Sequence, residues 1–175
     1  MRRLALLVAL AVPLAAAGAD LACPPGASLA GDGWPDGVEQ WCERPDDAGK
    51  ARRDGPSRSW YDDGALQNEA RWKMGRLDGH FVEYHRNGRK AQEGDWRDGE
   101  KQGRWTVWFE DGRPAEEAGY EKGILHGRFA TFFPGGGRRV EGRYCHGTQC
   151  GTWTTWDEDG RELGRMEHEE IRGAP

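Results

Sequence analysis

The stretch GRWTVWFEDGRPAEEAGYEKGILHG, residues 103–127, contains one full unit of the pattern that decides the fold. Its first part, RWTVWFE, is rich in aromatic and β-branched residues, which favour strands. The pair Asp111-Gly112 follows, and such pairs tolerate the positive φ that tight hairpin turns require. A second extended stretch, RPAEEAGY, then leads to a G-x-x-x-G connection that ends at Gly127. The unit therefore predicts a β-hairpin.

The same spacing recurs along the chain in steps of 24 residues, which points to tandem repeats. Three glycine series keep this step: Gly64 to Gly160, Gly55 to Gly151 and Gly75 to Gly147. Four aromatic series do so as well: Phe81, Trp105, Phe129 and Trp153; Trp60, Tyr84, Trp108, Phe132 and Trp156; Trp72, Trp96, Tyr120 and Tyr144; Tyr61, Phe109 and Phe133. Only Trp34 and Trp41 fall outside them. We therefore expect an all-β fold of tandem 24-residue β-hairpins.

Alternation along the strands assigns side chains to faces. The second strand of each unit has a small residue beside the aromatic one, which leaves room for a ring from a neighbouring strand. These small residues are Ala70, Gly94, Ala118 and Gly142. A glutamate column, expected on the solvated face, points the other way: Glu69, Glu93, Glu117 and Glu141. Trp105 and Trp108 lie on opposite faces if alternation is strict, or on one face if a bulge intervenes.

The spacing of glycine and aromatic residues over 55–164 resembles the MORN repeat, in the variant form common in bacteria. Residues 103–127 carry that unit nearly complete. The resemblance implies a row of antiparallel hairpins that forms one elongated, twisted sheet with an aromatic groove. It also implies a kinship with the YwqK-type antitoxin-like repeat family, and other MORN proteins act as scaffolds and have been associated with membrane lipids.

The chain begins with two arginines, an apolar run and an A-x-A site, which predicts a signal peptide over residues 1–19. The protein is thus expected to be exported, to the periplasm or the extracellular space. Lipid anchoring at Cys23 is less favoured, because Asp20 occupies a position where a lipobox requires an apolar residue. We expect an irregular segment with a degenerate half-repeat at 20–54 and a charged tail at 165–175.

Removal of residues 1–19 leaves 23 basic and 30 acidic side chains, a formal charge of −7. An acidic chain is not attracted to nucleic acid or to anionic membranes over long distances. No other apolar stretch approaches the roughly 20 residues that a membrane helix needs. The sequence therefore favours neither a nucleic-acid partner nor an integral membrane segment after signal cleavage.

Four cysteines in an exported chain favour disulfides, and three pairings are possible. Proximity in sequence favours Cys23–Cys42 and Cys145–Cys150, and the repeat phase puts Cys145 and Cys150 at the two feet of a tight turn. Zinc is the rival at this turn, since His146 lies between the cysteines. Zinc usually requires four ligands, however, so no metal ligand set is predicted.

Nothing in the sequence predicts catalysis or a cofactor. A repeated glutamate column gives each carboxylate nearly the same surroundings, whereas paired acid–base catalysts need distinct ones. The glycines belong to turns and precede no helix, so no phosphate-binding loop is expected. The remaining histidines share no repeat phase and are interpreted as surface residues: His80, His85, His126 and His168.

We therefore expect a non-catalytic exported protein that binds another protein or an envelope component. An aromatic column on an open face would form its binding groove, and the candidates are Tyr84, Trp108, Phe132 and Trp156. The alternative is an antitoxin or immunity-like protein that neutralises a basic toxin by direct binding. A carbohydrate-active enzyme is a third reading, but it lacks an asymmetric polar cluster.

Overall fold

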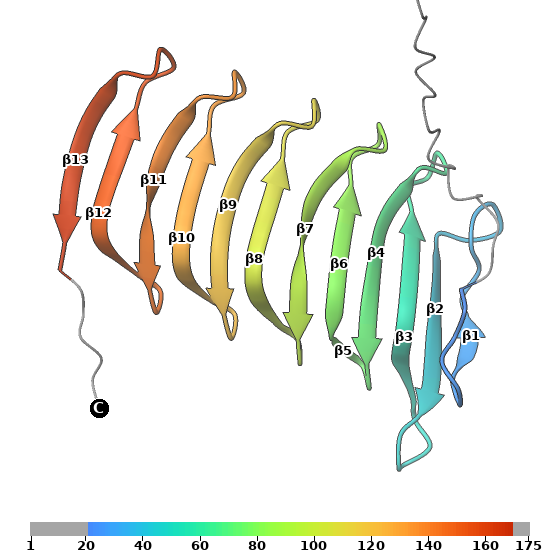
Figure 1. Cartoon of the computed structure of the whole chain (residues 1–175). Coiled ribbons are helices and arrows are strands. Elements are labelled where there is room, and N and C mark those ends of the chain that lie inside the picture. The colour runs from blue at the N-terminus through green and yellow to red at the C-terminus, as the bar shows by residue number, and fades with distance from the viewer. Residues whose placement is uncertain (1–20, 170–175) are drawn as a thin grey trace, which may run out of the picture.

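The structure is a computed structural model that describes residues 21–169. This part of the chain is all-β, with thirteen strands and no helix (Figure 1). The strands are β1 Ser28–Ala30, β2 Glu39–Pro45, β3 Ala51–Trp60, β4 Leu66–Lys73, β5 Arg76–Leu77, β6 Gly79–Tyr84, β7 Lys90–Arg97, β8 Glu100–Trp108, β9 Pro114–Glu121, β10 Ile124–Phe132, β11 Arg138–Cys145, β12 Thr148–Trp156 and β13 Glu162–His168. The predicted signal peptide at 1–19 lies outside the described residues.

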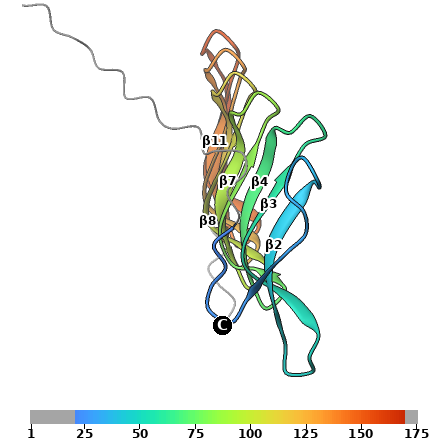
Figure 2. The ribbon, with the colours of Figure 1, turned by 90° about the vertical axis from the view of Figure 1, so that its right-hand side faces the viewer.

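All strands belong to one open antiparallel sheet, in which spatial order follows chain order from β1 to β13. Only β5 leaves this path, and it pairs with β4 alone. Figure 1 shows the strands side by side in one long row, and Figure 2 shows the same sheet edge-on as a single twisted layer. The predicted all-β antiparallel class is confirmed. Within the described residues, no helix is long and apolar enough to cross a membrane.

At one end of the sheet the hairpins close through three-residue loops. The N–H of Phe109 donates to Arg113 O and the N–H of Gly112 donates to Phe109 O, both at 2.8 Å. The Asp111 carboxylate accepts the Arg113 N–H at 2.9 Å. Gly112 has φ 88°, the left-handed conformation that closes such a loop. The Asp-Gly pair therefore makes the turn as the sequence predicted.

At the other end, two-residue turns join the hairpins to each other. Asp98 and Gly99 have φ 51° and 88°, so both central residues have the positive φ of a type I′ turn. Equivalent turns occur at Met74-Gly75, Lys122-Gly123 and His146-Gly147. Their twist matches that of the flanking strands, which keeps the row continuous.

Each two-residue turn is also bonded to the hairpin before it. The N–H of Gly99 donates to Leu77 O at 2.8 Å, and the N–H of Asp98 donates to the Asp78 carboxylate at 3.1 Å. We call the side chains that receive the second bond the turn acceptors: Asp54, Asp78, Gln102 and His126. They also follow each other at steps of 24, a series that the sequence analysis missed.

The aromatic part of the core lies on one face of the sheet and is built around rings packed on small residues, while Val82 and Ala130 are buried on the other face. Trp105 in β8 is only 3% exposed, and its indole covers Gly94 in β7. There the strand pairing shifts, and the Trp105 indole N–H donates to Asp95 O at 3.2 Å. Trp153 covers Gly142 in the same way and donates to Arg143 O at 3.1 Å. The predicted role of the small column is confirmed at these two sites.

The rings of this face contact one another across strands. Phe81 and Trp105 stack with centroids 6.0 Å apart, and Trp96 meets Trp105 edge-on at 5.3 Å. Lys101 lies over the Trp105 ring, with its Nζ 4.0 Å from the centroid. We call this side the ring face, defined by Phe81, Trp96, Trp105, Tyr120, Phe129, Tyr144 and Trp153.

Trp108 lies on the opposite side from Trp105. It lines a hollow together with Glu93 and Glu117, and Lys90 Nζ is 5.9 Å from its ring centroid. The bulge in the β8–β9 pairing falls between Val107 and Trp108 but does not bring the two tryptophans together. Of the two alternatives open in the sequence, strict alternation is the one that the structure shows.

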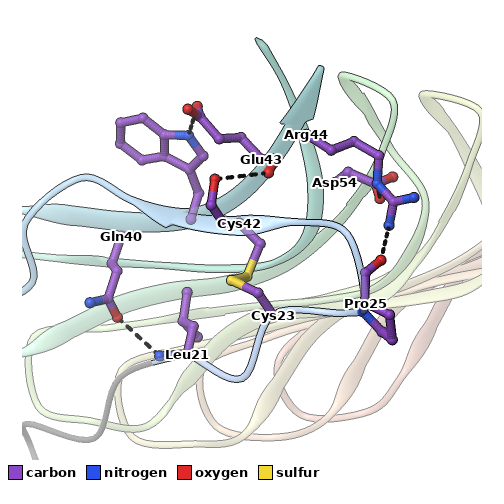
Figure 3. The surroundings of a disulfide bond; sticks show 10 residues. Leu21, Cys23, Pro25, Gln40, Cys42, Glu43, Arg44 and Asp54 are labelled. Carbon is purple, nitrogen blue, oxygen red and sulfur yellow. Dashed lines mark hydrogen bonds and ion pairs between the residues drawn. A yellow bond between two sulfur atoms is a disulfide. The ribbon is translucent and has the colours of Figure 1, made fainter. Parts of the chain in front are cut away.

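Within residues 20–54, where the sequence predicted an irregular segment with a degenerate half-repeat, lie β1, β2 and the start of β3. Residues 21–27 cross the sheet over these strands, and the Cys23–Cys42 disulfide holds them there (Figure 3). The N–H of Leu21 donates to Gln40 Oε1 at 3.4 Å.

The second disulfide joins Cys145 to Cys150. Both pairings favoured by sequence proximity are present.

Gly94→Ala should destabilise the protein. The added Cβ would lie 2.3 Å from the Trp105 ring, so the ring must leave its seat, and overpacking of this kind costs about 1–3 kcal/mol. Gly135→Ala is the matched control, because a Cβ there meets nothing within 4 Å. Urea unfolding measures both variants. Equal stability of the two would contradict the packing described here.

The two disulfides should differ in their contribution to stability. Cys23–Cys42 spans 19 residues and Cys145–Cys150 spans 5, and a longer loop loses more entropy when it is closed in the unfolded chain. Paired Cys→Ser replacement of the first should cost about 3 kcal/mol, and replacement of the second less. Urea unfolding of the two double variants tests this order, and the reverse order would refute it.

Candidate binding face

The second side of the sheet carries a row in which glutamates alternate with small side chains. Glu93 lies opposite Val82 on one side and Thr106 on the other, and Glu117 lies opposite Thr106 and Ala130. We call this side the glutamate face, after Glu69, Glu93, Glu117 and Glu141. The row runs perpendicular to the strands, so it extends over successive hairpins.

Every glutamate of the row is paired with a basic side chain. Arg58 Nε lies 2.9 Å from Glu69, and Arg104 Nη2 lies 2.6 Å from Glu117. Glu93 contacts His80 at 2.9 Å and Lys90 at 2.7 Å. Glu141 contacts Arg128 and Arg138, each at 3.0 Å. Four of these partners reach their glutamate from an adjacent strand: Arg58, His80, Arg104 and Arg128. Each carboxylate is partly buried and contacts at least one basic side chain.

Contacts on this face shift the pKa values of Glu93 and of the neighbouring Tyr84. Burial alone would raise the pKa of Glu93, but hydrogen bonds and charges from Lys90 and His80 hold that pKa below its ordinary value of 4.5. Burial raises the pKa of Tyr84 to about 12, and the neighbouring Glu69 carboxylate adds to the shift. The Tyr84 hydroxyl donates to Glu69 at 3.1 Å. At neutral pH this surface therefore presents charged carboxylates beside a neutral phenol.

The four candidate groove residues lie at equivalent places, each at a register shift at the end of its strand. The shifts fall just before Tyr84, Trp108, Phe132 and Trp156. Alternation along β10 and β12 places Phe132 and Trp156 on the glutamate face with the other two. All four side chains are half-buried. In the described part of the chain, no ring contact joins two of them, so the structure arranges them as separate rings along the row.

A hollow of about 400 Å³ lies beside Trp108 and the charged row. Its lining includes Trp108, Pro114, His80, Arg104 and Thr106. Trp108 therefore offers an apolar surface next to groups that donate and accept hydrogen bonds.

A second hollow of about 240 Å³ continues the row toward the N-terminal strands. Arg58, Glu69 and Val82 line it, and His80 is common to both hollows. Leu21, from the segment held by the Cys23–Cys42 disulfide, contributes to its lining. This segment therefore borders the glutamate face at that end.

The sequence analysis missed the basic side of these hollows. His80, Arg104 and Arg128 follow each other at steps of 24 and each contacts a glutamate of the row. His80 was interpreted as a scattered surface histidine, although its phase matches that of the two arginines. Recognition of basic residues in phase with the glutamates would have identified the ion pairs.

The pKa of Tyr84 predicts a loss of stability in alkali. Because the folded state holds the phenol proton up to about pH 12, while the ordinary value is 10.0, the contribution of Tyr84 is complete below pH 10 and is lost as pH rises toward 12. Tyr84→Phe should therefore lose less stability over this interval than the unmodified chain. Urea unfolding at stepped pH measures the difference, and parallel curves would contradict it.

The comparisons with known proteins add no relative. No family model matches the chain, and no curated protein matches it either.

Proposed function

We propose that this chain is an exported, non-catalytic protein of tandem 24-residue hairpins of the MORN type, which binds an extended partner on its glutamate face. The partner is a protein segment or an envelope component. One observation carries the proposal: Trp108 lines a hollow beside paired charges of the glutamate row, and a second hollow that shares His80 continues the row toward the N-terminal strands.

The spacing of the rings favours an extended partner over a compact one. One strand lies between the strands of successive rings, so the rings are two strand spacings apart, and at about 4.8 Å per spacing they recur about every 10 Å. A linear chain of peptide or sugar units would contact several rings in succession. The charged row beside the rings would supply hydrogen bonds to its polar groups, since both donors and acceptors are present.

The proposal includes no reaction. Each glutamate of the row is engaged with a basic or phenolic neighbour of similar kind, so none is set apart as an acid or a base. The two disulfides are typical of an oxidising, exported setting. Within that setting we place the protein in the periplasm or the extracellular space.

Neutralisation of a basic toxin is the second candidate. The observation in its favour is the excess of acidic side chains, 30 against 25 basic ones in the whole chain. An acidic binder attracts a basic partner over long distances, and salt weakens this attraction. If the chain neutralises a basic toxin, its affinity for that toxin should therefore fall steeply as the salt concentration rises.

Affinity capture from envelope extracts, with immobilised residues 20–175, tests the binding face. Trp108→Ala combined with Trp156→Ala should reduce the material retained by about tenfold or more, because truncated aromatic anchors cost about 2 kcal/mol or more. Mass spectrometry and sugar analysis of the retained material identify its class, and elution over a salt series distinguishes the second candidate.

Trp105→Phe is the control, since it removes the indole N–H bond to Asp95 on the ring face and leaves the glutamate face unchanged. It should lower stability and leave capture intact. The proposal fails if the Trp108 and Trp156 variant retains its partner fully while losing stability, because the two rings would then serve packing alone.

A further inference from the structure

We propose that Glu121, His126 and His146 form a binding site for a divalent transition-metal ion of the Zn²⁺ type. The site lies at the end of the sheet formed by the two-residue turns. It is independent of the partner proposed for the glutamate face.

The fold brings three potential ligand atoms together, one from each side chain. These atoms all lie within 4.8 Å of one another, and in the described part of the chain this is the only such group. The two imidazole rings have centroids 4.7 Å apart. His126 Nε2 lies 3.9 Å from the Glu121 carboxylate. Small side-chain rotations would close these separations to a shared ion.

Backbone contacts fix the positions of the three residues. Glu121 and His126 flank the turn at Lys122-Gly123, while His146 begins the next turn. The Gly147 N–H donates to Leu125 O at 2.8 Å, which holds the second turn against β10. The ligands therefore come from two adjacent hairpins that the sheet already joins, and the pair His126–His146 occupies the place of a turn acceptor and its turn.

Equivalent positions in the other hairpins do not offer this donor set. One hairpin earlier, the three places hold Arg97, Gln102 and Lys122, of which two are cations. Two hairpins earlier they hold Lys73, Asp78 and Asp98. Since the backbone arrangement is the same, the two histidines and the glutamate are not required by the turn, and the donor set needs another explanation.

Two imidazoles and one carboxylate are a ligand set that suits zinc. Zinc sites with three protein ligands keep a fourth position for water or another ligand, and here that position would face solvent because Glu121 and His146 are exposed. The nearby cysteines do not compete, since Cys145 and Cys150 are joined to each other. The site is thus a histidine–carboxylate site and not a thiolate site.

Metal binding would exchange one weak contact for a coordination bond. His126 Nδ1 accepts the His146 N–H at 3.4 Å, which is long for a hydrogen bond. Ligation through Nε2 places the ring proton on Nδ1, so this contact would be lost. The side of the ring that faces Glu121 is the side left for the ion.

Isothermal titration of the disulfide-bonded chain with ZnCl₂ tests the site. We expect one ion per chain. The combined His126→Gln and His146→Lys variant, which installs the residues of the preceding hairpin and keeps a turn acceptor, should weaken binding about 10–100-fold or more. His146→Lys alone should weaken it as well, so the test does not rest on one variant. The ring C–H signals of His126 and His146 should shift in NMR spectra with Zn²⁺.

His80→Gln is the matched control, because His80 also lies beside two carboxylates, at 2.9 and 3.1 Å, but outside this cluster. Its affinity for zinc should equal that of the unmodified chain. The proposal is overturned if the unmodified chain binds zinc no more tightly than the double variant, or if His80→Gln alone removes binding. Circular dichroism shows whether each variant keeps its sheet.

Discussion

A single sheet has no second layer against which to bury its side chains, so the protein buries its largest rings on one of its own faces and smaller residues such as Val82 and Ala130 on the other. It buries the large aromatic rings by packing them directly against glycine residues of the neighbouring strand. The Trp105 indole lies where a Cβ of Gly94 would stand, and Trp153 lies in the same relation to Gly142. The indole N–H groups then bond to strand carbonyls where the regular pairing is interrupted. Burial and backbone satisfaction are thus achieved by the same side chain.

The contacts that stabilise the sheet join neighbouring strands or hairpins, and the two ends of the sheet differ in structure. Ring contacts, cross-strand ion pairs and turn acceptors each join adjacent strands or adjacent hairpins. At the N-terminal end, the Cys23–Cys42 disulfide fastens residues 21–27 across the first long strands (Figure 3). At the other end, β13 leaves Leu163 and Met166 about two-thirds exposed, 67% and 65%. Charged residues between them, such as Arg165, discourage pairing of this edge with other strands.

The hairpin pattern, its turns, the role of the small residues and the glutamate–base pairs could all be predicted from residue spacing. Each depends on local alternation and on the requirement for positive φ at Gly112 and its equivalents. The face of Trp108 could not be predicted, since a bulge changes alternation in a way that depends on pairing with β9. The cluster of His126 and His146 was also beyond prediction. These residues are 20 apart, and only the stagger of adjacent turns brings them together.

The two faces therefore have separate roles in our account: the ring face holds the sheet together, and the glutamate face is available to a partner. The seat of Trp105 on Gly94 is the contact on which this division depends. Proton NMR of the folded chain tests it directly, because a hydrogen beneath an indole ring is shifted upfield and shows nuclear Overhauser effects to that ring. The account predicts that the Gly94 Hα signal is shifted upfield and shows nuclear Overhauser effects to the Trp105 ring. A Gly94 Hα at its random-coil position, without contact to the indole, would contradict it.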